Sequence, residues 1–218
     1  MRGLLIKDFK TIFVVQKTTL VFFLLFEVWF AYMGMAGAAM GYVIMLSVFI
    51  SIGTISYDDF NNGTTFFFTL PFERREYVTG KYLFGILLGT FGAVVGFLGC
   101  IISEVIRHGA VEWREPLLTA LGVLAVGILM LSLALPVQLK FGAEKGRVVM
   151  MMFYGTIGLI VSFGFISLQG NVINESELLA WVQGSNGAIL AVLAAVLYLI
   201  CLAVSYMLSV RIVEKKEL

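Results

Sequence analysis

Long apolar runs alternate with short polar stretches along this 218-residue chain. A helix needs about 20 apolar residues to cross the roughly 30 Å hydrocarbon core of a bilayer. Six runs reach that length when each boundary is allowed a few residues, so the pattern predicts six membrane-spanning helices. The first two are separated only by the small residues of 34–41, which we expect to form a turn. The predicted spans are residues 18–34, 36–56, 82–104, 116–139, 148–168 and 187–210.

The composition supports lipid as the solvent for most of this chain. Hydrophobic residues make up 60% of it and charged residues only 13%, which leaves too little polar surface to cover a globule in water. The predicted fold class is an all-α integral membrane protein, with residues 1–218 forming a single transmembrane domain. No block of basic residues indicates a nucleic-acid partner.

The distribution of positive charge predicts the orientation. Thirteen of the fifteen Lys and Arg residues fall in four polar stretches, whereas only Arg107 and Arg114 fall elsewhere. Short loops rich in Lys and Arg stay on the cytoplasmic side, and an even number of spans puts both termini on one side. We therefore expect both termini in the cytoplasm and the loops near 105–115 and 169–186 outside. The four basic stretches are the N-terminus, residues 57–81, residues 140–147 and the C-terminus.

Two of these stretches carry apolar side chains that should not be left in water. Residues 1–17 place apolar residues at roughly helical spacing with lysines between them, which predicts an amphipathic helix at the cytoplasmic membrane surface. Residues 57–81 contain Phe66, Phe67 and Phe68, followed by Pro71 at a position typical of a first helical turn. Such a loop is expected to dock on a partner. The alternative is an interfacial segment lying on lipid headgroups.

Catalytic chemistry is poorly represented in the sequence. His108 is the only histidine and falls in a predicted outer loop, and Cys100 and Cys201 lie inside apolar runs as expected for packing residues. The basic glycine-bearing stretch 142–147 lacks the phosphate-binding pattern G-x-x-x-x-G-K-[ST]. We therefore expect this chain not to be an enzyme and to hold no cofactor or metal. Any ATP would be bound by another chain.

Two features of the spans leave alternatives open. Glu27 is the one ionisable residue well inside a predicted span, where a bare charge is costly. It either lines a substrate path or is neutral and hydrogen-bonded. The pairs Gly37 and Gly41, and Gly85 and Gly89, have the spacing of close helix contacts, either between subunits or within one chain.

Three segments together resemble the permease subunit of the ATP-binding-cassette type-2 transporters, the small six-span kind associated with peptide export. They are the opening residues 1–9, the stretch 69–82 that leads into the third span, and residues 135–147. The resemblance implies a coupling helix within residues 57–72 that inserts into a separate cytoplasmic ATPase carrying ATP and Mg²⁺. It also implies a second ATPase contact at 140–147 and two permease chains, expected to be a homodimer, around a translocation path.

The expected function is export of amphipathic or hydrophobic cargo, peptides first, across a bacterial plasma membrane. Glu27 is the candidate for the translocation path. The expected ATPase-docking residues are Phe66, Phe67, Phe68, Arg74, Arg75, Glu144 and Lys145.

Two other functions fit the same residues. A proton-coupled secondary transporter could use Glu27 as its titrating group. A non-transporting immunity or scaffold protein would also lack catalytic residues, and it would act without nucleotide.

Overall fold

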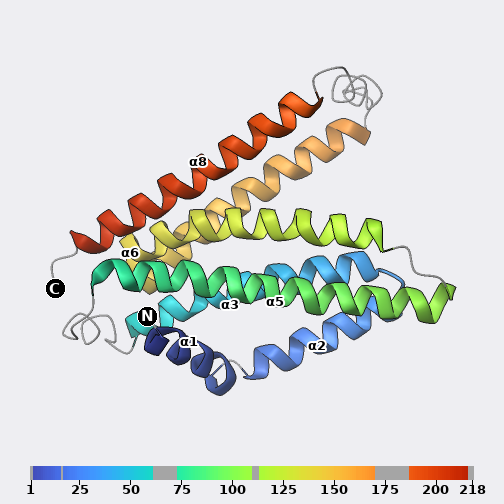
Figure 1. The fold of residues 1–218 in the computed structure, drawn as a ribbon, viewed down its shortest axis with the longest axis horizontal. Coiled ribbons are helices and arrows are strands. Elements are labelled where there is room, and N and C mark those ends of the chain that lie inside the picture. The colour runs from blue at the N-terminus through green and yellow to red at the C-terminus, as the bar shows by residue number, and fades with distance from the viewer. Residues whose placement is uncertain (1, 16, 61–72, 110–112, 170–186, 216–218) are drawn as a thin grey trace.

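The computed structural model describes residues 2–15, 17–60, 73–109, 113–169 and 187–215, and every regular element in these ranges is a helix. The predicted all-α integral membrane fold is thereby confirmed. The helices are α1 (Arg2–Val15), α2 (Lys17–Tyr32), α3 (Ala36–Phe60), α5 (Arg74–His108), α6 (Arg114–Gln169) and α8 (Gly187–Glu214), shown in Figure 1.

Four segments of the described chain are long and apolar enough to cross a membrane: Ala36–Asp59, Arg74–Arg107, Arg114–Gly142 and Val192–Glu214. They contain the second, third and fourth predicted spans and residues 192–210 of the sixth. The first predicted span corresponds to α2, whose 16 residues extend only about 24 Å at 1.5 Å per residue. The fifth lies in the second part of α6. The number of six spans therefore stays a prediction.

Helix α6 folds back on itself inside the basic stretch 140–147. Gly142 has φ 75° and ψ −175°, far from helical values, within an otherwise continuous run of 56 helical residues. Figure 1 shows the two arms of α6 meeting at this point and diverging toward the other end of the molecule. The predicted polar connection between two antiparallel spans is thus reduced to a break at a single glycine.

The four basic stretches gather at one end of the bundle. Figure 1 places α1, the end of α3, the start of α5, the bend of α6 and the end of α8 together at that end. The opposite end holds the turn between α2 and α3, where Gly34 has φ 84°. The prediction that the whole small-residue patch 34–41 forms this turn is wrong, because residues 36–41 are the helical start of α3. This arrangement agrees with the predicted topology, in which the basic end faces the cytoplasm.

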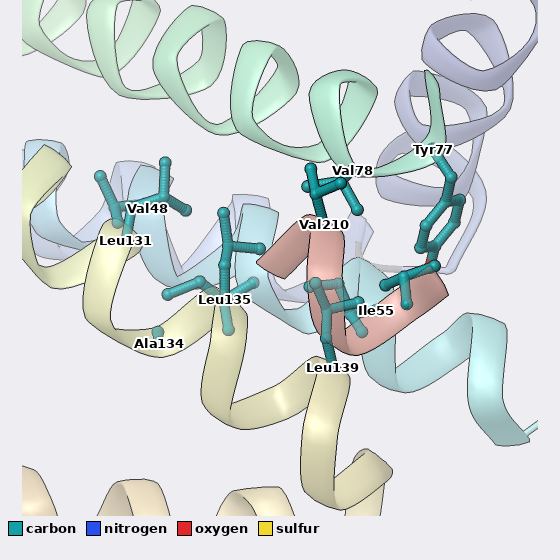
Figure 2. Packing of buried hydrophobic residues seen from close by; sticks show 11 residues of the cluster. Val48, Ile55, Tyr77, Val78, Leu131, Ala134, Leu135, Leu139 and Val210 are labelled. Carbon is teal, nitrogen blue, oxygen red and sulfur yellow. The ribbon is translucent and has the colours of Figure 1, made fainter. Parts of the chain in front are cut away.

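Helix α3 forms the centre of the packing. Near the basic end, apolar side chains from α3, α5, α6 and α8 make one buried cluster (Figure 2). Glycines of α5 let that helix approach α3 closely: a Cβ on Gly96 would lie 3.1 Å from the Cα of Met40. The cluster consists of Val48, Ile52, Ile55, Tyr77, Val78, Leu131, Ala134, Leu135, Leu139, Val210 and Val213.

The glycine pairs from the sequence have different surroundings. A Cβ on Gly85 would lie 2.5 Å from a methyl of Leu131, and one on Gly89 would lie 3.3 Å from a methyl of Val48. This pair therefore serves packing within the chain. In contrast, a Cβ on Gly37 would have no neighbour within 4 Å.

Candidate functional site

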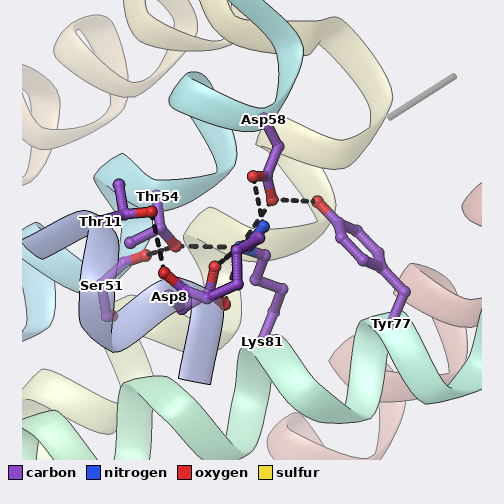
Figure 3. Close-up of polar contacts among 8 residues, drawn as sticks. Asp8, Thr11, Ser51, Thr54, Asp58, Tyr77 and Lys81 are labelled. Carbon is purple, nitrogen blue, oxygen red and sulfur yellow. Dashed lines mark hydrogen bonds and ion pairs between the residues drawn. The ribbon is translucent and has the colours of Figure 1, made fainter. Parts of the chain in front are cut away.

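A buried network of charged side chains lies at the basic end of the bundle, where α1, α3 and α5 meet (Figure 3). Its centre is the ammonium of Lys81 on α5. Lys81 Nζ lies 2.9 Å from both carboxylate oxygens of Asp8 on α1 and 2.8 Å from Asp58 Oδ2 on α3. It also donates a hydrogen bond of 3.1 Å to Thr54 Oγ1. One lysine thus joins three helices.

Two further side chains complete the network. Lys7 Nζ lies 3.0 Å from Asp8 Oδ1 and also donates to Asp58 Oδ1. The hydroxyl of Tyr77 donates to Asp58 Oδ2 at 3.1 Å. Two lysines therefore face two aspartates, and the network has no net charge.

The burial of this network explains why its pairing matters. The side chains of Lys81 and Asp8 are each 3% exposed and that of Asp58 is 8% exposed, whereas Lys7 is 26% exposed. Removing a charge from water costs several kcal/mol, and a partner and further hydrogen bonds must offset this cost. Lys81 has two carboxylates and a hydroxyl, which meets that requirement. Lys7 is the member in contact with solvent.

The network sits at both ends of the chain between α3 and α5, which makes up most of the range 57–72 predicted to dock on an ATPase. Asp58 is two residues before the end of α3 at Phe60, and Tyr77 and Lys81 follow soon after the start of α5 at Arg74. The chain between these helix ends is 61–72 and its flanking Glu73. Both ends of that segment are therefore fastened to one another and to α1 by ion pairs rather than by apolar contact alone.

Sequence reasoning missed this network. It counted Lys7 among the lysines between the apolar residues of 1–17 and counted Lys81 among the basic residues of 57–81. The available signal was the spacing of Asp8 and Ile12, four residues apart and therefore on one face of α1. Both residues, taken with their backbone, are 2% exposed. An acid on the face that α1 buries requires a cationic partner, although the sequence does not say which.

The apolar residues of α1 lie on two faces with different surroundings. One face packs on the bundle, and the ring of Phe9 meets that of Phe84 edge to face at 5.1 Å between centroids. Ile6 and Val14 stay 67% and 62% exposed. The predicted N-terminal helix is confirmed as a helix over Arg2–Val15, and its position at the membrane surface stays a prediction.

The two arginines expected to dock an ATPase contact the end of α8. Arg74 Nη1 donates to the backbone carbonyls of Val213 and Glu214 at 3.1 and 2.8 Å. Arg75 Nε pairs with Glu214 Oε1 at 2.8 Å on the exposed surface. A cation at the last carbonyls of a helix is favourable because these carbonyls are not bonded within the helix and carry partial negative charge. Both arginines thus tie α8 to the start of α5, and their docking role stays a prediction.

The other expected docking residues are described only in part. Phe66, Phe67 and Phe68 lie outside the described residues, as does the side chain of Glu144. Lys145 is exposed, three residues beyond the break at Gly142. It therefore lies at the surface of the basic end, next to the bend of α6.

Glu27 lies near the opposite end from the ion network, on the face of α2 that meets α5. It is partly buried and lines a cavity of about 570 Å³ between these two helices. Val28 and Tyr32 line the cavity from α2, and Arg107 closes it near the end of α5. The guanidinium of Arg107 donates to the carbonyl of Tyr32 at the end of α2. The remaining lining residues are Gly99, Ile102, Ser103 and Ile106.

Side chains that could hold a metal ion were sought among the described residues. Within the described part of the chain, no group of three or more His, Cys, Asp or Glu side chains is placed to hold a metal ion. The ion network offers two carboxylates, and both are already paired with lysines. What this arrangement can do is hold helix ends together and transmit force between them.

Comparison with known proteins gave one result that covers almost the whole chain. A family model described as ABC-2 family transporter protein matches residues 3–214. Searches of curated proteins and of solved structures gave no match. The matched range includes the ion network, the α2–α5 cavity and the bend of α6.

Proposed function

The chain belongs to the ABC-2 family of transporter proteins, and on that premise we propose that it is the permease subunit of an exporter for amphipathic peptides. The family assigns it to the membrane component of an ABC transporter, which implies a partner ATPase subunit. The proposal adds the cargo, the direction out of the cell and docking through residues 57–72. It also adds a second copy of the chain and a bacterial plasma membrane.

One observation carries the docking proposal, namely that the helix ends around residues 61–72 are joined by the network of Lys81, Asp8 and Asp58. A segment that receives force from a partner transmits it only if its ends cannot be displaced independently. Here α3 and α5 share the ammonium of Lys81, and α1 is held by the same group. A pull on the segment would therefore move three helix ends as one body.

The chemical energy enters from the partner. The ATPase would bind ATP and Mg²⁺, and its closure would draw on the docked segment and tilt the helices of the permease, a rigid-body mode of switching. Phe66, Phe67 and Phe68 would be the anchors, since aromatic side chains in a partner's pocket contribute a large share of binding energy. This chain's own contribution is docking and movement.

Family membership favours this function over the two alternatives. A proton-coupled secondary transporter would leave the phenylalanines of the docking segment without a purpose. An immunity or scaffold protein would act without nucleotide. Both alternatives predict that the chain works in the absence of an ATPase.

The test is copurification with a co-expressed ABC ATPase subunit from the same genome, in detergent, comparing wild type, Phe67→Asp and Thr64→Asp. Both variants add one negative charge to the same segment, but only Phe67→Asp removes an aromatic anchor. We expect Phe67→Asp to lose the ATPase and the permease-dependent part of ATP hydrolysis, while Thr64→Asp retains both. Retention of both by Phe67→Asp would show that the segment does not dock in this way.

A further inference from the structure

We propose that the cavity between α2 and α5 is a binding site for a cationic amphipathic peptide, whose positive side chain pairs with Glu27. The proposal rests on the proposed function, since it names the cargo class and a place where cargo would bind. It is carried by the shape of the cavity, by its apolar walls and by the position of one carboxylate within it.

The shape of the cavity depends on Gly99, which has no side chain. Glu27 reaches across from α2 to α5 at Gly99, and a Cβ built on Gly99 would lie 2.3 Å from Glu27 Oε1. That distance is well inside van der Waals contact, so even alanine at this position would displace the carboxylate. Gly99 therefore leaves the space in which the Glu27 carboxylate lies against α5, within the wall of the cavity.

The walls are apolar and uncovered. Val28 is 69% exposed, Ile102 58% and Ile106 78%, although all three line the cavity. A volume of about 570 Å³ falls within the range typical of small-ligand sites. It accommodates a few side chains rather than a whole folded partner. An elongated molecule with an apolar face could lie along it.

The carboxylate provides the selectivity. Among the described residues, none donates a hydrogen bond to the Glu27 carboxylate or forms an ion pair with it. Glu27 lies in the first predicted span, where a charge is costly and therefore calls for a partner, and the partner that matches a carboxylate is a cation. Arg107 lines the same cavity, but its guanidinium donates to the carbonyl of Tyr32.

The depth of Glu27 favours a peptide over a phospholipid. Glu27 precedes the end of α2 by five residues, and Gly99 precedes the end of α5 by nine. At 1.5 Å per residue the carboxylate lies about 8 to 14 Å inside those ends. A phospholipid carries its charges at one end and would present acyl chain at this depth. An amphipathic helix carries lysines along its length, and each lysine has a long apolar stem that can lie on the cavity wall.

The experiment measures binding of a labelled synthetic helical peptide of Leu and Lys to the purified permease in lipid nanodiscs, by fluorescence anisotropy. A matched peptide with norleucine in place of each Lys reports apolar binding alone. The variants are Glu27→Gln, Gly99→Ala and the control Glu104→Gln, which removes an acid of α5 outside the cavity. Elution from a sizing column and the thermal unfolding midpoint confirm that each variant is folded.

We expect Glu27→Gln and Gly99→Ala to weaken binding of the cationic peptide about tenfold or more, the effect of a lost charge-assisted contact, and to leave the norleucine peptide unchanged. Glu104→Gln should bind like wild type. Equal binding of the cationic peptide by wild type and Glu27→Gln would overturn the proposal, as would an equal loss for both peptides. Displacement of the peptide by anionic phospholipid to the same extent in wild type and Glu27→Gln would also contradict it. None of these outcomes alters the Phe67→Asp result, so the docking proposal stands or fails separately.

Discussion

Replacing Lys81 by methionine tests the ion network directly, because methionine keeps the length and removes the charge. In the native chain the ammonium contacts both oxygens of Asp8 at 2.9 Å and Asp58 at 2.8 Å. Without it, two carboxylates share the single ammonium of Lys7, which leaves one uncompensated negative charge among side chains less than a tenth exposed. Breaking a buried pair in this way costs about 3–5 kcal/mol.

The assay is the thermal unfolding midpoint of the purified chain in detergent. For a chain of this size, the expected cost corresponds to a fall of about 10 °C. The control is Lys10→Met, the same substitution at an exposed lysine of the same N-terminal helix that carries Asp8. It should change the midpoint little, since surface charges contribute little to stability.

A double-mutant cycle then separates pairing from simple loss of packing. Asp8→Asn alone leaves the network with a net positive charge and should also destabilise the fold, but Asp8→Asn combined with Lys81→Met restores neutrality through Lys7 and Asp58. We expect the double variant to be more stable than the sum of the single effects predicts, by about 1–3 kcal/mol. Additivity of the two effects within about 0.5 kcal/mol would refute the reasoning, because it would mean that the two side chains do not stabilise each other.

Two backbone predictions concern glycines, with thermal unfolding as the measurement. Gly142→Ala should destabilise the fold by about 1–3 kcal/mol, since φ 75° with ψ −175° is almost restricted to glycine, whereas Gly155→Ala in the second arm of α6 should be neutral or stabilising. An equal effect of the two would show that the bend does not depend on Gly142. Gly96→Ala should lower the free energy of unfolding by about 1–3 kcal/mol, because the new Cβ would lie 3.1 Å from the Cα of Met40. The control Gly122→Ala should leave stability unchanged, since a Cβ at this position has no neighbour within 4 Å. A wild-type midpoint for Gly96→Ala would show that α3 and α5 can move apart to admit the methyl group.

The sequence predicted the helices well where a run of apolar residues defines them, and less well where a helix continues beyond that run. The third span was expected to begin at residue 82, but α5 begins at Arg74. The extra turns pack on the bundle because Tyr77 and Val78 enter the core and Lys81 enters the ion network, whereas Arg75 stays exposed. Hydropathy alone cannot detect this extension, because a buried lysine has the same score as an exposed one.

The candidate sites were also predictable only where a local pattern marks them. Glu27 was found because one acid inside an apolar run is visible without knowing its neighbours. The pairing of Lys81 with Asp8 joins residues 73 positions apart, and no local pattern specifies it. A single acid in an apolar run is thus visible in the sequence, whereas the partner of a buried charge required the packing of three helices.

The ion network also gives apolar helices in lipid a specific packing arrangement. Lipid tails are as apolar as the helices, so hydrophobic burial does not select one packing of α1, α3 and α5 over another. A buried lysine with two carboxylates is satisfied in few arrangements, since sliding one helix by a turn would separate charges now 2.8 to 2.9 Å apart. The network therefore fixes how the three helix ends fit together. Because the segment 61–72 lies between two of these ends, the same charges that define the packing would carry force from a docked partner into the membrane.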